Sequence, residues 1–139
     1  MKITLAETDA EIMNCLPVMQ VLRPHLDADT FLSRARQQQS QGYKLIYLED
    51  KEIITTVAGY RVFDIFFSAK TLYIDDLVTH PDARGRGHAS HLLKWIIDHA
   101  KQIGCSTVSL DSGYQRFDAH RFYLNHGFTL ASHHFALSL

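Results

Sequence analysis

The sequence has little cysteine, little proline and almost no net charge. Its 139 residues include two cysteines and three prolines, and 14 basic residues face 15 acidic ones. Cys15 and Cys105 are far apart and form no Cys-x-x-Cys or Cys/His metal spacing, which excludes a disulfide framework or a zinc ribbon. A formal net charge of -1 argues against bulk electrostatic attraction to nucleic acid or to an anionic membrane.

Long apolar runs are missing as well. No stretch approaches the ~20 residues that a membrane span needs, and the N-terminus, MKITLAETDAEIM, lacks the apolar segment of a secretory signal. We therefore expect a cytoplasmic protein with reduced thiols. The hydrophobic fraction of 46% and the charged fraction of 21% are ordinary globular values, and the length fits a single domain over residues 1–139.

Hydrophobic periodicity predicts an α/β chain. Helices are expected at residues 9–22, 30–41, 87–102 and 117–125, and strands at residues 2–6, 43–48, 53–63, 71–79, 107–110 and 128–137. Pro17 is expected to break or kink the first helix. Three successive strands followed by β-α-β-α-β imply a mixed sheet with helices on both faces.

A glycine-rich segment, Arg84-Gly85-Arg86-Gly87-His88-Ala89, joins a predicted strand to the most regular predicted helix. Glycine lets a backbone approach a ligand closely, and a helix N-terminus carries partial positive charge. This arrangement is typical of a phosphate or diphosphate site. A short glycine motif alone fits a solvated basic turn equally well. The Walker pattern is absent, and Ser90 stands where the dinucleotide fingerprint needs its third glycine.

The segment from Leu77 to Leu93 resembles the acetyl-CoA motif of the GNAT N-acetyltransferase superfamily, Gln/Arg-x-x-Gly-x-Gly/Ala, with Arg84, Gly87 and Ala89 at its three positions. A second segment, Ala119 to Phe128, is similar to the family's A-x-x-(F/L)-Y-x-x-x-G-F. Two motifs in the right order are more specific than either alone. The resemblance implies acetyl transfer from acetyl-CoA to a primary amine of a small molecule or peptide. It also implies a GNAT-like sheet of six or seven strands, with the fourth and fifth splayed apart.

The resemblance further implies roles for single residues. The pantetheine arm would pair with the backbone of the fourth strand, and one of that strand's amides would stabilise the oxyanion. Tyr123 matches the general acid for the leaving thiolate, a transfer of modest cost between a phenol with a pKa near 10 and a thiol near 8.5. The alternative for Tyr123 is a core tyrosine. The implied cofactor-binding residues are Leu77, Val78, Thr79, Arg84, Gly85, Arg86, Gly87, His88, Ala89 and Ser90.

The general base is left open between Asp75 and Asp111. Asp111 ends a predicted strand, where some family members place a catalytic carboxylate. Asp75 and Asp76 are successive strand residues, so only one of them is expected on a given face, and the family register turns Asp75 toward the active cleft. The alternative for Asp76 is a turn or an ion pair with Arg61 or Arg121.

Some positions and assignments stay open. Arg116 stands where many family members carry an Asn before the tyrosine, so its role and that of His120 are not assigned. No metal site is predicted, because the histidine pairs lack further ligands. The alternative to an enzyme is a non-catalytic acyl-CoA-binding sensor or partner domain of the same fold. RNA binding through Arg84 and Arg86 is disfavoured by the net charge. The oligomeric state is left open between a monomer and a homodimer.

Overall fold

The computed structural model describes all 139 residues as two compact units, residues 1–109 and residues 110–139. The single domain expected over residues 1–139 stays a prediction. The elements in chain order are β1 (Lys2–Leu5), α1 (Asp9–Asn14), α2 (Leu16–Leu22), α3 (Phe31–Ser40), β2 (Lys44–Asp50), β3 (Ile53–Ile65), β4 (Ala69–Thr79), a 3-10 turn (Pro81–Ala83), α4 (His88–Gln102), β5 (Thr107–Leu110) and α5 (Phe117–Asn125). No helix is both long enough and apolar enough to cross a membrane.

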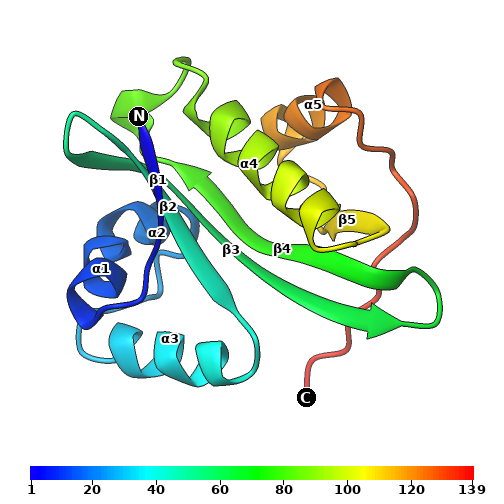
Figure 1. Ribbon diagram of the computed structural model, residues 1–139, viewed down its shortest axis with the longest axis horizontal. Helices are drawn as coiled ribbons and strands as arrows, with labels where there is room; N and C mark the ends of the chain where they lie inside the picture. The colour runs from blue at the N-terminus through cyan, green and yellow to red at the C-terminus, as the bar shows by residue number, and fades with distance from the viewer. The chain divides into compact units, whose positions relative to one another are not determined.

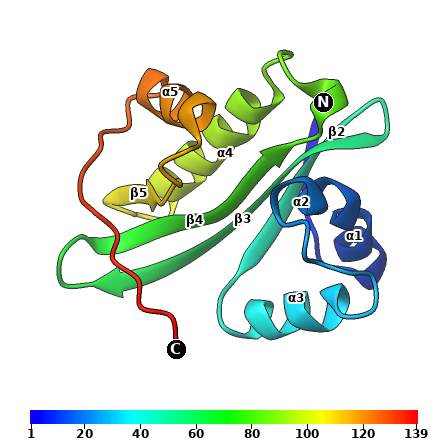
Figure 2. The same ribbon diagram turned by 180° about the vertical axis from the view of Figure 1, so that it is seen from behind.

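The sheet runs in the order β1-β2-β3-β4-β5, and the pairs β1–β2, β2–β3 and β3–β4 are antiparallel. Helices α1, α2 and α3 cover one face of β2 to β4, and α4 covers the other (Figures 1 and 2). The expected α/β class with helices on both faces is confirmed. The sheet has five strands, however, where the sequence predicts six or seven.

Helix α4 shows how the sequence builds this core. Leu92, Leu93 and Ile96 recur on one face of the helix, and all three are fully buried. Burying a side chain of this size contributes about 1.5–3 kcal/mol. The apolar face therefore fixes α4 on the sheet, and with it the position of the glycine-rich loop that precedes it.

Pro17 breaks the first helix as expected. Helix α1 ends at Asn14 and α2 begins at Leu16, with Pro17 in its first turn. Proline lacks the N–H that a continuous helix would need at this position, and its ring would crowd the preceding turn. At the other end, Thr8 and Glu11 form a reciprocal capping box that fixes where α1 begins.

Two β-bulges interrupt the regular pairing of β3. Opposite β2, the partners change from Leu48–Thr56 to Glu49–Ile54, so Thr55 has no partner. Opposite β4, they change from Gly59–Asp76 to Tyr60–Ile74, which leaves Asp75 as the extra residue. A bulge changes the direction of the side chains around it. The two bulges involve Thr55 and Asp75, and both residues return in the candidate active site.

The strand predicted at residues 128–137 does not form. Residues 128–139 have no regular secondary structure, and the large apolar side chains of Leu130, Phe135, Leu137 and Leu139 are exposed. Alternating apolar residues are only half of what a strand needs, because its backbone groups must also find a partner strand. Periodicity reports the first condition and not the second.

Candidate active site

The glycine-rich loop takes the conformation that only glycine adopts readily. Gly85 and Gly87 have φ angles of 77° and 79°, and Gly87 is the N-cap residue of α4. A Cβ placed on either glycine would meet nothing within 4 Å. No side chain caps α4, so the first amides of this helix have no side-chain acceptor. The loop thus offers exposed backbone donors at a helix N-terminus, as an anion site requires.

The side chains of the predicted loop residues differ in their exposure to solvent. Arg84 and Arg86 are exposed, and Nη2 of Arg86 donates to the main-chain oxygen of Asp82 at 3.0 Å. His88 is buried instead, at 4% exposure. Its Nδ1 lies 2.8 Å from Oγ1 of Thr55, the bulged residue of β3, and its Nε2 lies 3.8 Å from Asp50 Oδ2. His88 therefore anchors the start of α4 to the sheet, and only its backbone faces the loop.

The end of β4 turns alternate backbone groups away from β3, toward the edge on which β5 lies. The amide of His80 donates to Thr55 O at 2.8 Å, which makes His80 part of the ladder with β3. In an antiparallel ladder every second residue turns its N–H and C=O to the opposite edge. Leu77 and Thr79 are the residues that do so here, and Val78 pairs with Val57. This edge can accept a further extended chain.

Both acids of β4 face the layer formed by α1, α2 and α3, which corrects the expectation that they face opposite sides. The bulge at Asp75 suspends the strict alternation of the strand. Asp75 binds the Arg61 guanidinium through both carboxylate oxygens, at 2.7–3.1 Å. Asp76 accepts from Nε of Arg23 at 3.0 Å and from the Tyr43 hydroxyl at 2.8 Å.

The two ion pairs belong to one network. Arg61 also donates to Gln38 of α3 at 3.2 Å and lies over the Tyr43 ring at 5.4 Å. Burial and the neighbouring Asp76 raise the pKa of Tyr43 well above its usual value, so the phenol remains a hydrogen-bond donor. Asp75 and Asp76 are about one-fifth and one-seventh exposed, at 21% and 14%. Carboxylates this far from water need such partners.

Gly59 makes room for this network. It pairs with Asp76 across the ladder, and a Cβ built on it would fall 1.7 Å from the Tyr43 hydroxyl oxygen. The Tyr43 hydroxyl thus reaches Asp76 by passing through the space that any other side chain at position 59 would fill. Glycine is needed here for close approach and not for a special backbone angle.

Tyr123 lies on α5 in the second unit. Its ring contacts Phe122 and Phe128 edge-on, at centroid distances of 5.3 and 5.5 Å. Burial raises its pKa to about 12, and the positive charge of Arg116 partly opposes this rise. The phenol therefore keeps its proton at every physiological pH, as a general acid must. Its proton is about 3.5 pKa units harder to lose than that of a free thiol, about 5 kcal/mol.

The remaining residues of the second unit that the sequence analysis names are Asp111, Arg116 and His120. Asp111 Oδ1 is 3.5 Å from Nδ1 of His134. Nε2 of His120 lies 2.7 Å from the carbonyl oxygen of Gly113, so this nitrogen carries a proton and donates it. His120 thus ties the loop before α5 to the helix. Arg116 is the N-cap residue of α5.

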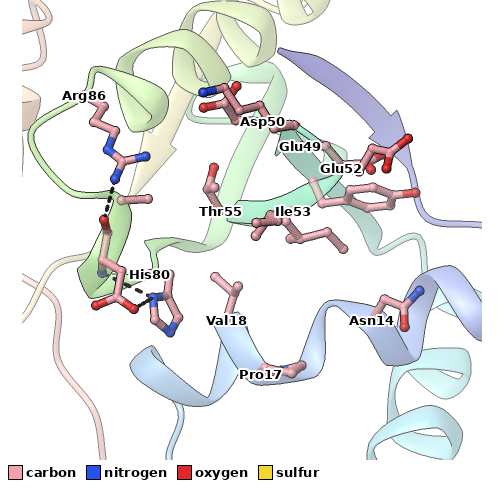
Figure 3. A pocket seen from close by; sticks show the side chains of 15 residues that line it. Asn14, Pro17, Val18, Glu49, Asp50, Glu52, Ile53, Thr55, His80 and Arg86 are labelled. Carbon is pink, nitrogen blue, oxygen red and sulfur yellow. Dashed lines mark hydrogen bonds and ion pairs between the residues drawn. The ribbon is translucent and has the colours of Figure 1, made fainter.

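A cavity of about 610 Å³ adjoins the glycine-rich loop within the first unit. Figure 3 shows it between α2, the β2–β3 hairpin and the segment from His80 to Arg86, with Val18 and Thr55 facing each other across it. Glu49, Asp50 and Glu52 contribute carboxylates, and Arg86 and His80 contribute cationic or ionisable groups. No group of three or more His, Cys, Asp or Glu residues is placed to hold a metal ion.

Sequence reasoning did not single out Arg23, Gln38 or Tyr43. They come from three places before β3 in the chain, and only the folded sheet brings them to the acids of β4. The adjacent acids Asp75 and Asp76 were a usable signal, because two carboxylates inside a strand need cations nearby. The sequence offers Arg61 as a partner of Asp76, whereas the structure pairs it with Asp75.

Comparison with known proteins agrees with the fold. A family model described as "Acetyltransferase (GNAT) family" matches residues 9–128. An uncharacterized N-acetyltransferase of Bacillus subtilis (strain 168), YhdJ, is 38% identical over 86% of this chain and 85% of its own. An aminoalkylphosphonate N-acetyltransferase of Salmonella typhimurium (strain LT2) is 27% identical over 88% of this chain and 80% of its own. The structure of AAC(6')-Iy in complex with the bisubstrate analogue CoA-S-monomethyl-acetylneamine superposes with a TM-score of 0.86. That likeness covers 99% of this chain and 97% of AAC(6')-Iy at 13% identity, and it shows the fold alone.

Proposed function

Because this chain belongs to the acetyltransferase (GNAT) family and is an N-acetyltransferase with acetyl-CoA as its donor, we propose that the loop from Arg84 to Ser90 binds the cofactor diphosphate. The observation that carries this proposal is the pair of exposed glycines with positive φ at the uncapped start of α4. Two arginines of the same loop supply positive charge, and the helix N-terminus adds its own. His88 acts through its backbone, because its side chain is buried against Thr55.

The arm of the cofactor pairs with the free edge of β4 in this proposal. Leu77 and Thr79 direct their backbone groups away from β3, and Val78 fixes the ladder between them. One of the outward amides stabilises the oxyanion that forms when the amine attacks the thioester. The arm then runs from the loop back along the strand, toward the bulge at Asp75.

Three side chains carry the proton transfers. Tyr123 protonates the leaving thiolate, which its retained proton supports. Asp111 and Asp75 act on the acceptor amine. Both oxygens of Asp75 accept hydrogen bonds from Arg61, which fixes the orientation of this carboxylate. The base that takes the proton, directly or through water, is Asp111 or Asp75 in this proposal.

The acceptor is the primary amine of a small molecule in the leading proposal. The similarity to an aminoalkylphosphonate N-acetyltransferase makes small amines the first class to assay, and a peptide amine is the second class. Release of CoA thiol in a panel of such amines, with product masses, tests the proposal. A protein that binds acetyl-CoA but turns over no amine in either class would point to the acyl-CoA sensor instead.

The cofactor site is tested by Gly87→Glu, which puts a carboxylate beside the diphosphate and a side chain at a left-handed φ of 79°. We expect acetyl-CoA affinity measured by calorimetry to fall at least tenfold, about 1.4 kcal/mol. The matched control is Gly104→Glu, which has a similar φ of 83° at the other end of α4. It carries the same backbone strain and should leave the affinity unchanged. Unaltered affinity in a folded Gly87→Glu protein would remove the loop from the site.

A homodimer is the assembly that we propose for this chain. Phe66 and Phe67, at the tip between β3 and β4, are fully exposed, and Ile65 beside them is 44% exposed. Adjacent exposed aromatic side chains favour association, and a second copy brings an identical apolar tip.

A further inference from the structure

Arg23 lies just past α2 and reaches the bulge of β4. Its Nε donates to Asp76 Oδ1 at 3.0 Å, and its Nη2 donates to the main-chain oxygen of Asp75 at 3.1 Å. Its Nη1 makes no hydrogen bond, and the side chain is 43% exposed. The other arginine of the network, Arg61, is less accessible at 27%. Nη1 of Arg61 makes no hydrogen bond either, so Arg23 differs from Arg61 in being the more exposed cation of the network.

The position of Arg23 along β4 matters for the reaction. The loop from Arg84 to Ser90 follows the end of β4, and in the proposed function the cofactor arm runs back along Leu77 to Thr79. The acetyl group then arrives at the level of Asp75 and Asp76, where the guanidinium of Arg23 lies. Arg23 directly follows α2, so it would lie beside an acceptor that approached the thioester from that side.

The charges of the network alternate in sign. Arg61 and Arg23 contribute two positive charges, and Asp75 and Asp76 contribute two negative ones, so the cluster has no net charge. A plain ammonium group would interact with the carboxylates but would also be repelled by Arg23. A zwitterion satisfies both, with its amine toward the carboxylates and its acidic group on the open side of Arg23. Guanidinium suits this role, because its planar donors match carboxylate and phosphonate oxygens.

From this arrangement we propose that Arg23 binds an acidic group of the acceptor, so that the enzyme prefers amines that also carry a carboxylate or a phosphonate. This inference rests on the proposed function and refines its substrate class. It makes Arg23 a specificity-determining residue, while acetyl transfer itself depends on the loop, the β4 edge and the acid and base.

The competing explanation is that Arg23 only holds the bulge in place. In that case its loss would disturb Asp75 and Asp76 and would slow every acceptor alike. If Arg23 binds an acidic group, its replacement should instead slow the acidic acceptors selectively. The two explanations therefore differ in how the effect divides between acidic and plain amines.

The test compares β-alanine, 2-aminoethylphosphonate and propylamine as acceptors for the wild type and for Arg23→Gln. We expect the wild type to favour the two acidic amines. Arg23→Gln should lower their kcat/KM about tenfold, mainly through a higher KM, and leave propylamine within about twofold. The size of the loss for carboxylate against phosphonate identifies which acid the site prefers. Arg23→Lys should restore part of the preference, because it keeps the charge without the planar fork.

Arg36→Gln is the matched control. Arg36 has nearly the same exposure, 42%, and one ion pair, to Asp9 at 2.6 Å, but it lies on α3 away from the bulge. It should leave all three acceptors unchanged. An equal loss for all three amines in Arg23→Gln, or a wild type without preference for acidic amines, would overturn the inference and leave the acetyltransferase activity standing.

A binding measurement covers the case in which no tested amine is acetylated. That result would count against the proposed function alone. Calorimetric titration of 2-aminoethylphosphonate into the CoA-saturated protein then tests Arg23 directly. Binding to the wild type that is lost in Arg23→Gln supports the inference, whereas equal binding, or none to either protein, contradicts it.

Discussion

At the scale of the residue, the raised pKa of Tyr123 keeps the phenol protonated and also makes it a weaker acid. Tyr123→Phe keeps the ring contacts with Phe122 and Phe128 and removes only the hydroxyl. We expect kcat to fall about 10²–10⁴-fold at nearly constant acetyl-CoA affinity, the range for a lost general acid. Steady-state kinetics with the true acceptor, beside calorimetry with acetyl-CoA, measures both. A wild-type rate in Tyr123→Phe, with chemistry limiting, would remove the residue from the mechanism.

The same residue predicts a loss of stability in alkali. The pKa of Tyr123 is raised to about 12 in the folded protein, against about 10 in the unfolded chain. Between these values the unfolded chain gives up its proton and the folded one does not, so stability falls as pH rises from about 10 to 12. Denaturant titrations at pH 9 and pH 11 should show a smaller loss in Tyr123→Phe than in the wild type. Equal losses would show that the phenol is not shielded from water.

Residues differ in how far the sequence reveals their roles. The loop glycines could be identified because a positive φ and a helix start leave a local pattern. The orientation of Asp75 and Asp76 could not, because the bulge depends on pairing with β3. The partners of Asp76 are 53 positions away in Arg23 and 33 positions away in Tyr43. Contacts at such separations leave no periodicity in a single sequence.

At the scale of the element, the turn between β2 and β3 is built from unfavourable residues. Lys51 and Glu52 have φ angles of 51° and 65°, as a type I′ hairpin turn requires, although neither residue is suited to it. Replacing them together by Asn-Gly should stabilise the protein by about 1 kcal/mol. A thermal melt should rise by about 3 °C for a chain of this size. The reversed pair Gly-Asn is a useful comparison, because it tests whether the gain depends on the residue order.

Elements with a strong local signal were predicted closely. Strand β5 and helix α5 have the predicted bounds, and the break at Pro17 separates α1 from α2. The strand expected at residues 128–137 fails because nothing local records whether a partner strand is present. Without it the sheet has five strands and not the expected six or seven. Local chemistry sets where an element begins and ends, and pairing decides whether a strand exists.

At the scale of the whole molecule, the exposed tip at Phe66 and Phe67 bears on assembly. Replacing both by serine should leave the melting temperature nearly unchanged, because fully exposed side chains contribute within about 0.5 kcal/mol. Self-association should weaken, and sedimentation velocity across a range of concentrations would show it. Ile53→Ser, at 66% exposure on the β2–β3 hairpin, is the control for a general loss of surface apolarity. A dimer that persists unchanged in the double variant would place the interface elsewhere.

The Tyr43–Gly59 contact has a consequence for anyone who wishes to diversify this enzyme. The hydroxyl of Tyr43 occupies the volume of a side chain at position 59, so the two positions share one space. A library that randomises position 59 alone would consist almost entirely of damaged variants, and a screen of it would sample little else. Randomising both together admits combinations in which a small residue at 43 accompanies a larger one at 59. Such pairs would free Asp76 from its phenol and leave the Arg23 contact in place, which opens a route to acceptors of a different size.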